Sequence, residues 1–425
     1  TLEDIPELCN RYGIHSIIIA IPTLKGSKLN HVIDLCVSTH CAVQLLSDPQ
    51  LVGSGAPQQG AFRELNPADF LSRDEVTLDT DQISGYLTGK TVLVTGGGGS
   101  IGSELCRQVM RFKPGKLLIF DIYENCAYEL LMELQQKYGR DIPVTVLVGS
   151  IRDKKRLDEV FETYHPTVVF HAAAHKHVPL MEVSPAEAVK NNVLGTKNLL
   201  VSASEHDVER FVQLSTDKAV NPTSVMGCTK RICEMLIQTF AGNTDMKCVA
   251  VRFGNVLGSH GSVIPLFEAQ IKKGGPVTLT DPNIERYFMT IPEAAQLVLQ
   301  AGALAESGNI YVLDMGEPVK IMDLAKQLIR FYGYEPGVNM EIKIVGLRPG
   351  EKLYEELMMD EEQDKMRRTQ HNKIFVASPR SIDLAEFYGQ LQELAEAAQH
   401  NDEGVVQQLA KMIPTFTPTR QNLKL

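Results

Sequence analysis

The feature that most constrains the fold is a regular alternation of short apolar runs with longer amphipathic stretches between Lys90 and Arg252. The apolar runs are rich in valine, isoleucine and leucine and predict six buried strands, at Thr91–Thr95, Lys116–Phe120, Val144–Val148, Thr167–His171, Arg210–Leu214 and Lys247–Arg252. Helices are predicted between them, at Ile101–Phe112, Glu124–Tyr138, Lys154–Tyr164, Ala186–Glu205 and Val225–Ala241. Strands that alternate with helices are typical of βαβ units, so we predict an α/β fold with a doubly wound, Rossmann-type parallel sheet.

The sequence on either side of this region predicts further parts of the molecule. Residues 1–46 predict the end of an upstream α/β unit, and residues 47–89, rich in glycine, proline and glutamine, predict a linker and an arm. The alternation covers residues 90–256 and then loosens, with glycine and proline interruptions, so we assign residues 257–360 to a smaller domain. Residues 361–425 predict a helical extension.

The composition limits the classes of partner. A formal net charge of −10 argues against nucleic acid as a general partner, because binding to phosphates needs a basic surface. The 8 cysteines include no C-x-x-C pair and no histidine cluster at zinc spacing, so we expect reduced thiols and no metal site. No apolar run approaches the ~20 residues that span a bilayer, so we expect no membrane contact of this chain, which begins with Thr1 and is read as a fragment.

A glycine-rich turn joins the first predicted strand to the first helix and carries the spacing G-x-x-G-x-x-G. Residues without a Cβ let backbone N–H groups and a helix N-terminus approach a pyrophosphate. The predicted pyrophosphate-binding residues are Gly96, Gly99, Ser100, Ile101 and Gly102. The next strand is followed by Asp121, and an acid there accepts hydrogen bonds from ribose hydroxyls and repels a 2′-phosphate. The turn and its acid therefore predict a site for NAD in preference to NADP.

A second cluster of reactive side chains follows the fifth predicted strand, in the run Ser215–Lys230. Thr216, Asp217 and Lys218 stand at the carboxyl end of that strand, which is where open parallel sheets bind their ligands. Lys230 comes four residues after Met226, so these two share one helical face. This stretch is the predicted catalytic region.

Several motifs in this order resemble the extended short-chain dehydrogenase/reductase family: T-G-x-x-G-x-x-G, the acid after the second strand, H-A-A-A at 171–174, and a strand-end S-T-D with a downstream lysine. Within that family the chain is similar to the large, membrane-anchored bacterial UDP-N-acetylglucosamine 4,6-dehydratases of polysaccharide and glycan biosynthesis. The runs that carry this resemblance are Thr95–Gly102, Ala172–Glu182, Ser215–Lys230, Arg252–Pro265, Arg286–Thr290 and Arg348–Glu355. By the same resemblance, residues 1–89 correspond to the end of a nucleotide-binding-like domain and its connecting arm.

The resemblance implies NAD-dependent dehydration of UDP-N-acetylglucosamine to a UDP-4-keto-6-deoxy sugar. The sugar is oxidised at C4, water is eliminated across C5 and C6, and the hydride returns to C6, so the NAD stays tightly bound and is recycled. It assigns Asp217 to the C6 hydroxyl as acid and Lys218 to C5 as base, a role that requires desolvation of the amine. It also implies that Thr216 hydrogen-bonds the C4 oxygen and that Lys230 binds the nicotinamide ribose.

Position 226 departs from the wider family, in which a tyrosine takes the proton of the C4 hydroxyl. Met226 cannot take a proton. Methionine here is characteristic of the large anchored enzymes, whereas smaller relatives that invert C5 keep tyrosine. We therefore expect retention at C5 and another proton acceptor, either Asp217 or a water molecule. Packing of Met226 against the nicotinamide is compatible with this expectation.

Further candidate residues lie around the two predicted binding sites. The remaining cofactor-binding candidates are Ser150, Ile151, Ala172 and Ala173. The substrate-binding candidates are His175, Lys176, His177, Asn255, Arg286, Arg348 and Glu351. The two histidines and the lysine line the sugar pocket or have a structural or cofactor-side role. The resemblance implies that the asparagine and both arginines hold the diphosphate, with a surface salt bridge as the alternative for each arginine, and that the glutamate contacts the uridine ribose.

The expected partner is a UDP-sugar, and the chain is expected to form a homo-oligomer, a dimer or larger. The expected location is cytoplasmic, with the parent protein anchored to the bacterial inner membrane and this region on its cytoplasmic face. Two other functions stay open. A UDP-sugar 4-epimerase would not need the pair Asp217 and Lys218 and normally uses the tyrosine that is missing here. A non-catalytic NAD-binding sensor usually loses the active-site lysine, whereas Lys230 is present.

Overall fold

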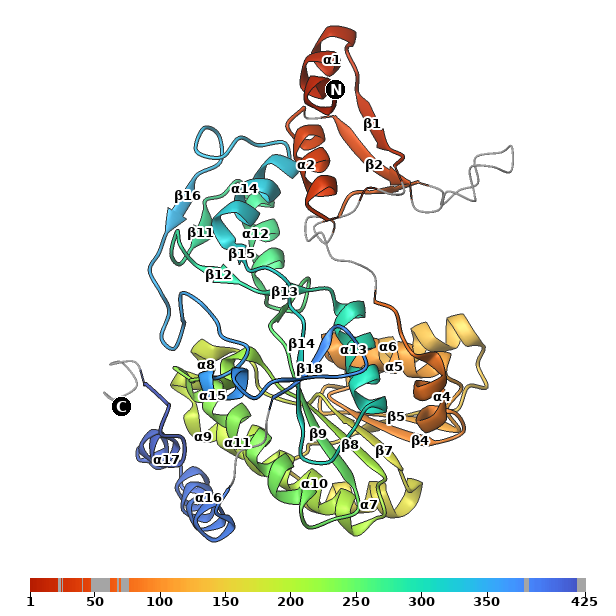
Figure 1. Ribbon diagram of the computed structural model, residues 1–425, viewed down its shortest axis with the longest axis vertical. Helices are drawn as coiled ribbons and strands as arrows, with labels where there is room; N and C mark the ends of the chain where they lie inside the picture. The colour runs from red at the N-terminus through yellow and green to blue at the C-terminus, as the bar shows by residue number, and fades with distance from the viewer. Residues whose placement is uncertain are drawn as a thin grey trace. The chain divides into compact units, whose positions relative to one another are not determined.

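The computed structural model (Figure 1) describes residues 1–21, 24, 26–39, 41–46, 62–66, 69, 76–377 and 382–418. Most of the expected linker, including residues 47–61, lies outside the described residues. The chain forms two compact units, which we name by their content. The small unit comprises Thr1–Glu75, Asn255–Thr290 and Gly316–Gly346. The sheet unit comprises Val76–Gly254, Ile291–Met315 and Leu347–Leu425.

The sheet unit contains a nine-stranded sheet in the order β17-β18-β14-β9-β8-β7-β4-β5-β6. Its strands are β4 (Thr91–Thr95), β5 (Lys116–Asp121), β6 (Val144–Val148), β7 (Val168–His171), β8 (Arg210–Leu214), β9 (Lys247–Arg252), β14 (Ile310–Leu313), β17 (Arg367–Arg368) and β18 (Ile374–Ala377). The first seven of these are parallel, and β17 and β18 are antiparallel additions at one edge. All six predicted strands and the doubly wound α/β fold are confirmed. The strand order reverses between β4 and β7, the kind of position where such sheets bind nucleotides.

Helices cover both faces of this sheet (Figure 1). The helices of the sheet unit are α4 (Thr80–Leu87), α5 (Ser100–Arg111), α6 (Glu124–Tyr138), α7 (Lys154–Tyr164), α8 (Val178–Val183), α9 (Pro185–Ala188), α10 (Gly195–Glu205), α11 (Val225–Ala241), α13 (Ile291–Ala303), α15 (Asp360–Gln363), α16 (Leu384–Gln399) and α17 (Val405–Met412). The predicted bounds of α6, α7 and α11 are confirmed to the residue. The helix predicted at Ala186–Glu205 is instead divided by a π-helical segment, η3 (Val189–Leu194). A π-turn offsets the helix by one residue, and such turns are frequent at functional sites.

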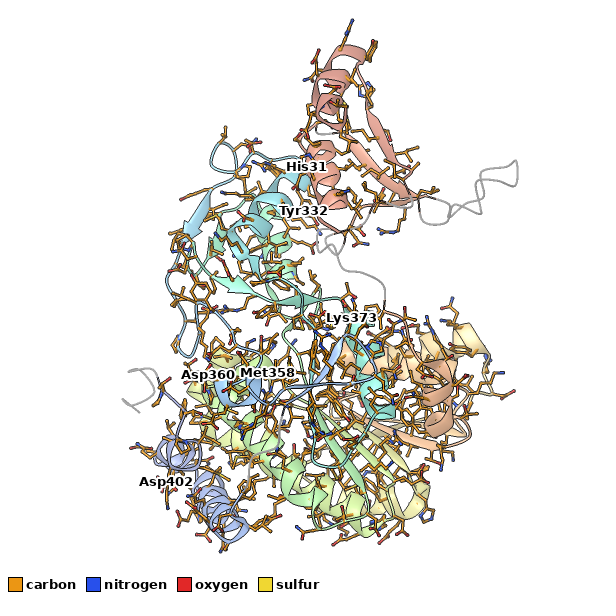
Figure 2. The ribbon with its side chains drawn as sticks, viewed as in Figure 1. His31, Tyr332, Met358, Asp360, Lys373 and Asp402 are labelled. Carbon is orange, nitrogen blue, oxygen red and sulfur yellow. The ribbon has the colours of Figure 1, made fainter. Side chains whose placement is uncertain are left out.

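The division into units differs from the boundaries expected from the sequence. Residues 291–315, expected in the smaller domain, belong to the sheet unit because β14 pairs with β9 and α13 packs against α5. Residues 347–360 also belong to the sheet unit. The expectation of a purely helical extension over residues 361–425 is wrong, because β17 and β18 fall in that range and extend the sheet beyond β14. Lys373, just before β18, lies 3.7 Å from Glu293 of α13 and ties this edge to the helix layer (Figure 2).

The small unit combines the N-terminal segment with two later segments around one core. Its elements are η1 (Leu2–Asp4), α1 (Ile5–Tyr12), β1 (Ser16–Ile19), α2 (Gly26–Val37), β2 (Ala42–Leu46), β3 (Phe62–Glu64), β10 (Asn255–Val256), α12 (Val263–Lys272), β11 (Val277–Leu279), β12 (Glu285–Arg286), β13 (Phe288–Met289), β15 (Val319–Lys320), α14 (Ile321–Phe331) and β16 (Ile342–Ile344). Ile33 of α2, Phe267 of α12 and Leu328 of α14 are buried in the same cluster. The side chain of Gln327 also donates to Asp34, with 3.1 Å between the atoms. Residues 1–46 therefore share a core with the later segments and do not form a separate unit.

Within the described ranges of both units, no helix combines the length and the apolar character that crossing a membrane requires.

Candidate active site

The glycine turn after β4 is shaped by close backbone approaches. Gly96 has φ +67°, and a Cβ added there would lie 2.6 Å from the backbone nitrogen of Ala173. A Cβ at Gly102 would lie 2.0 Å from the carbonyl oxygen of Gly96. Helix α5 begins directly after Gly99, and no side chain caps it. The turn therefore brings a helix N-terminus with its positive dipole to the sheet edge, an arrangement that fits the pyrophosphate of a dinucleotide.

Asp121 organises this turn from the end of β5. Its Oδ2 accepts a hydrogen bond from the Gly98 backbone N–H at 2.9 Å, and its Oδ1 accepts one from Tyr123 N–H at 2.9 Å. Because each carboxylate oxygen has two lone pairs, both retain capacity to accept from ribose hydroxyls. The residues present thus fit a nucleotide with an unmodified ribose next to the glycine turn.

The other predicted cofactor-side residues border this turn. Ala172 N–H donates to Thr95 O at 3.0 Å, which places the H-A-A-A run beside the end of β4. Ser150 Oγ accepts from Arg152 N–H at 3.2 Å, and Ile151 is buried against Gly195. Ile151 is therefore part of the core in the described structure, and Ser150 stabilises its own turn.

His171, which starts the H-A-A-A run, is a buried structural residue. Its Nδ1 lies 2.7 Å from Thr95 Oγ1, and its Nε2 lies 2.9 Å from Thr196 Oγ1. Burial, and to a lesser extent the charge of Lys230, lowers the pKa of His171 to about 3. The imidazole is therefore neutral at physiological pH and connects β4, β7 and α10.

Asp217 occupies the centre of the candidate site, in the 3-10 turn η4 (Asp217–Ala219) just after β8. Its side chain is fully buried. Its Oδ1 accepts hydrogen bonds from Thr216 Oγ1 at 2.9 Å and from Lys218 Nζ at 2.9 Å. Its Oδ2 is also buried and has no hydrogen-bond partner among the residues that the structure describes. A buried oxygen without a partner is costly unless something else binds it, so this atom is the strongest pointer to a ligand.

Lys218 faces a second carboxylate that the sequence did not lead us to predict. The Nζ of Lys218 lies 3.7 Å from Glu355 Oε1, and the side chains are 22% and 4% exposed. Glu355 comes from the segment after α14, in the run R-P-G-E-K-L-Y-E that carried part of the family resemblance. We refer to Asp217, Lys218 and Glu355 as the reactive cluster. It contains two carboxylates and one ammonium group.

Helix α11 places Met226 and Lys230 next to the reactive cluster. Ser224 Oγ caps the helix by accepting from Gly227 N–H at 3.1 Å, and a Cβ at Gly227 would lie only 2.2 Å from Lys218 O. The first turn of α11 therefore contacts the backbone of the turn that carries Asp217 and Lys218. Met226 is 4% exposed and packs in the main core of the sheet unit.

Lys230 lies one turn further along α11 and is also buried. Its Nζ donates to Leu214 O at 2.6 Å, at the end of β8. Burial lowers the pKa of Lys230, and the nearby Cys233 and Glu234 oppose that shift. The structure thus holds this amine against the end of β8, the strand that leads to Asp217.

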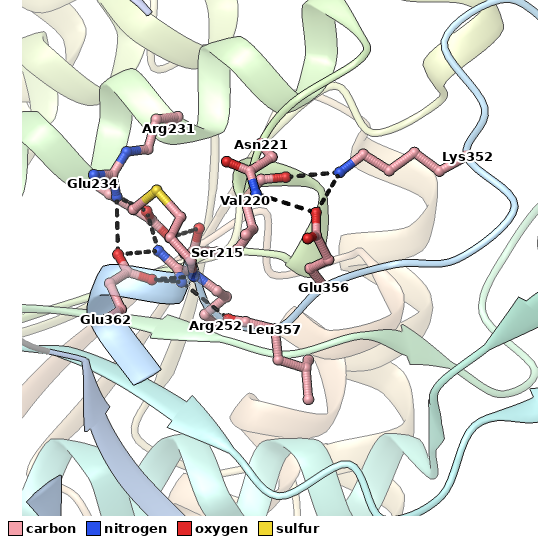
Figure 3. A network of polar contacts seen from close by, with 11 residues as sticks. Ser215, Val220, Asn221, Arg231, Glu234, Arg252, Lys352, Glu356, Leu357 and Glu362 are labelled. Carbon is pink, nitrogen blue, oxygen red and sulfur yellow. Dashed lines mark hydrogen bonds and ion pairs between the residues drawn. The ribbon is translucent and has the colours of Figure 1, made fainter. Parts of the chain in front are cut away.

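A second group of side chains is linked by hydrogen bonds and ion pairs, and we name it the paired cluster (Figure 3). It consists of Ser215, Arg231, Glu234, Arg252 and Glu362. Arg252 donates from Nε to Glu234 Oε1 at 3.0 Å and from Nη2 to Glu234 Oε2 at 2.8 Å. It also donates from Nη1 to Glu362 Oε2 at 2.8 Å. Two arginines and two glutamates balance in charge.

Electrostatics within the paired cluster favour the ionised forms. Burial by itself would raise the pKa of Glu234, but Arg252 and Arg231 outweigh burial and lower it to about 2. Ser215 Oγ donates to Glu234 Oε1 at 2.7 Å, so the cluster holds the residue that leads from β8 into the reactive cluster. No local pattern in the sequence predicts this cluster, because its members come from β9, α11, α15 and the residue after β8.

The predicted sugar-pocket residues 175–177 follow β7 and have exposed side chains. Asn192, in the π-helical segment, brackets the first of them, since its Oδ1 accepts from His175 N–H at 2.8 Å and its Nδ2 donates to His175 O at 3.0 Å. Partial desolvation lowers the pKa of Lys176 and, together with the charges of Lys176 and Arg348, that of His177. These three residues therefore form a patch of basic side chains on the surface of the sheet unit.

Arg348 and Glu351 pair with each other. Arg348 Nη2 lies 3.1 Å from Glu351 Oε1, and the arginine side chain is 57% exposed. This contact corresponds to the salt bridge that was the alternative for Arg348. Asn255 and Arg286 belong to the small unit, where the β10 strand that begins at Asn255 pairs with β13, and Arg286 Nη1 donates to Glu285 O at 2.7 Å.

Comparisons with known proteins bear on this arrangement. A family model described as polysaccharide biosynthesis protein matches residues 92–379. Over 360 residues the chain is 53% identical to the capsular polysaccharide biosynthesis protein CapD of Staphylococcus aureus, which covers 84% of this chain and 60% of that protein. The chain thus spans about three fifths of the length of this curated relative.

Two reactions are named among other relatives. The chain is 33% identical over 271 residues to the UDP-N-acetylglucosamine 4,6-dehydratase (inverting) of Campylobacter jejuni, covering 63% of this chain and 76% of that protein. It is 31% identical over 351 residues to the UDP-glucose 4-epimerase of Rickettsia canadensis, covering 79% and 98%. The solved structure of Pen from Bacillus thuringiensis matches with a TM-score of 0.64 at 35% identity, covering 70% of this chain and 89% of that chain. Sequence identity alone does not distinguish the two reactions.

Proposed function

The chain belongs to the polysaccharide biosynthesis protein family, and we propose that it is an NAD-dependent nucleotide-sugar 4,6-dehydratase. The proposed reaction converts UDP-N-acetylglucosamine to a UDP-4-keto-6-deoxy sugar with retention of configuration at C5. The observation that carries this proposal is the buried Asp217, bonded to the adjacent Lys218 through one oxygen while the other oxygen has no partner among the described side chains and backbone. Elimination of water next to a ketone needs such an acid and base side by side.

The proposed cofactor is held by the glycine turn and Asp121. The N-terminus of α5 would bind the pyrophosphate, and Asp121 would accept from the ribose hydroxyls while repelling a 2′-phosphate. A bound NAD supplies the hydride acceptance and hydride return that a 4,6-dehydration needs. Binding measurements test this selectivity: we expect the purified protein to contain or to bind NAD and not NADP.

We propose that Asp217 carries one proton through the reaction. Its unpartnered Oδ2 accepts the proton of the C4 hydroxyl as the ketone forms and then donates it to the C6 hydroxyl, which leaves as water. These two transfers use the same proton and need no tyrosine at position 226. Lys218 removes the C5 proton and returns it to the same face, which gives retention. Met226 contributes an apolar wall, consistent with its burial.

Incubation of the protein with UDP-N-acetylglucosamine tests the proposal by mass spectrometry. The expected product is lighter than the substrate by one water molecule, and in deuterated water it carries deuterium at C5 with the original configuration. An epimerase, the activity named for one relative, gives a product of unchanged mass, and a non-catalytic NAD sensor gives no product. Inverted C5 would contradict retention while leaving dehydration intact.

We also propose an assembly and a location for the protein. We expect a homo-oligomer in solution, which sedimentation would measure. We also expect the parent protein to be anchored to the inner membrane with this region on its cytoplasmic face, which fractionation and protease protection of the native protein would test.

A further inference from the structure

The reactive cluster presents a problem for the proposed base. Lys218 can remove a proton from C5 only as a free amine, yet the two carboxylates at 2.9 Å and 3.7 Å from its Nζ favour the ammonium form. The ammonium proton therefore has to leave before the elimination step, and it has to go to a group within reach.

We propose that Glu355 is a positioning residue that takes up the resting proton of Lys218 and returns it at the end of each turnover. This inference rests on the proposed dehydration and adds a third group to its acid and base. Glu355 fits the role because its side chain is 4% exposed and its Oε1 lies 3.7 Å from the lysine nitrogen. A small movement of the flexible lysine brings the two atoms within hydrogen-bond distance.

The segment that carries Glu355 is fixed on both sides. Before it, Lys352 Nζ donates to Val220 O at 3.0 Å and pairs with Glu356 at 3.2 Å. After it, Leu357 O accepts from Arg252 Nη1 at 3.0 Å (Figure 3). Two anchors within a few residues hold the carboxylate of Glu355 towards the turn that carries Lys218.

Other charged groups on the surrounding elements have different partners. Glu182 Oε1, from α8, accepts from Val225 N–H at 2.7 Å. Lys230 Nζ donates to Leu214 O, and Glu356 Oε2 also accepts from Asn221 Nδ2 at 3.3 Å. Asp217 and Glu355 are therefore the carboxylates that the described contacts place on Lys218.

The chemistry of Asp217 directs the proton of Lys218 to Glu355. When Asp217 takes the proton of the C4 hydroxyl it becomes neutral and no longer holds the ammonium through charge. The remaining anion of the cluster is Glu355, and in a desolvated site a neutral amine next to a neutral carboxylic acid replaces the ion pair at lower cost than in water. The cluster keeps the same number of protons during this transfer, so no proton has to be lost to solvent.

The protons and electrons balance over the proposed reaction steps that follow oxidation at C4. The ammonium proton moves from Lys218 Nζ to Glu355 Oε1, and the free amine then takes the proton from C5. The C5–H electron pair forms the C5–C6 double bond, the C6–O bond breaks, and the departing oxygen takes the proton from Asp217 and leaves as water. Lys218 then gives its proton back to C5, while a bound NAD would supply the hydride that returns to C6. Glu355 then returns its proton to Lys218.

Glu355→Gln tests this role in the full-length chain, with Glu356→Gln as the matched control. Glutamine at 356 can still accept from Lys352 and Asn221, so the control keeps the loop anchored. With Glu355 present the rate is expected to vary little around neutral pH, because the transfer conserves protons. In Glu355→Gln the lysine must lose its proton to solvent, so the rate at neutral pH is expected to fall ~100-fold and to rise with pH towards ordinary lysine pKa values near about 10.4.

Glu355→Asp tests whether the carboxylate or the length of the side chain matters, because it keeps the carboxylate on a shorter side chain. We expect it to restore part of the rate and the flat pH profile, with all variants unfolding at the wild-type temperature. Wild-type rate in Glu355→Gln, or a loss with an unchanged pH profile, would overturn the inference.

A readout without turnover distinguishes failure of this inference from failure of the proposed function. An amine-reactive acylating reagent labels Lys218 only in its free-amine form, and peptide mass spectrometry measures the labelling at each pH. The midpoint of this pH dependence reports the electrostatic coupling between Lys218 and Glu355. Loss of a carboxylate within 4 Å is expected to lower the labelling midpoint by about one pH unit in Glu355→Gln and not in Glu356→Gln. An unchanged midpoint sinks the inference even if the wild type dehydrates its substrate. Absence of dehydration with a shifted midpoint sinks the proposed function alone.

Discussion

The paired cluster and the reactive cluster meet just after β8, where Ser215 belongs to the first and Asp217 to the second, yet their charges are arranged in opposite ways. The paired cluster balances two arginines against two glutamates, and Arg252 alone makes three charge-assisted hydrogen bonds of 3.0 Å or less to them. The reactive cluster has two carboxylates for one ammonium, and Asp217 Oδ2 has no partner in the described parts of the chain. The difference indicates that the first cluster supports the fold, whereas the second retains a buried oxygen that can bind a further group.

The largest expected effect is on stability, from Glu234→Gln in the paired cluster. The substitution leaves Arg252 and Arg231 buried next to a neutral amide, and removal of one partner of a buried ion pair typically costs about 3–5 kcal/mol. The free energy of unfolding from urea titration measures this loss. Glu356→Gln, at the surface, serves as the control, and a loss below about 1 kcal/mol would contradict the structural role of the paired cluster.

The next largest effect is on rate, from Asp217→Asn in the reactive cluster. The shape is conserved but the amide can neither accept nor donate the proton, so the dehydration rate should fall at least ~100-fold, which corresponds to about 2.7 kcal/mol of barrier. Lys218→Ala should cost at least as much. Stability should change little, because neither substitution leaves an arginine unpaired. Near-normal turnover in either variant would remove the distinction between the two clusters.

The acid dependence of stability should come from the paired cluster. The pKa of Glu234 is lowered to about 2 in the folded protein, so the unfolded chain binds more protons in acid. Its contribution is therefore fully present above the ordinary glutamate range and is lost as the pH falls from about 4.3 towards 2. Urea midpoints across that range should fall for the wild type and fall less for Glu234→Gln. Parallel curves for the two proteins would exclude Glu234 as a source.

The smallest effect should come from Ser215→Ala, at the junction of the two clusters. It removes the 2.7 Å bond to Glu234, and a hydrogen bond to a charged group contributes about 1.5–3 kcal/mol at most, less here because both arginines remain. We expect a stability loss of about 1 kcal/mol and a rate within a few-fold of wild type. A rate loss as large as that of Asp217→Asn would mean that the paired cluster positions the catalytic turn directly.

The sequence predicted the central sheet because its strands and helices carry local signals. The strands β4 to β9 are apolar runs bounded by turns, and helix α11 begins where Ser224 provides a cap. Asp217 and Lys218 were also accessible, because a strand end in an open parallel sheet is a ligand site whatever the rest of the chain does.

The remaining features depend on contacts between distant residues. Ile310–Leu313 is a short apolar run between glycines, and nothing local shows that it pairs with β9. Glu355 reaches Lys218 only because its segment returns to the sheet unit after α14, which spacing cannot reveal. The pair Arg348 and Glu351, three residues apart, was visible in the sequence, yet the family resemblance favoured ligand roles for both.

The pairing of Arg252 with Glu362 has a consequence for synthesis in the cell. Glu234 precedes Arg252 by 18 residues, whereas Glu362 follows it by 110. At ribosomal speeds of about 5–20 residues per second, the nascent chain spends on the order of 5–20 s with an arginine that has only one of its two carboxylates. The unfinished sheet also lacks β18 throughout that interval and lacks β14 for the first part of it. Slow translation between these two positions should therefore lower the yield of folded protein and raise its demand for chaperones, whereas a pause after β18 should not.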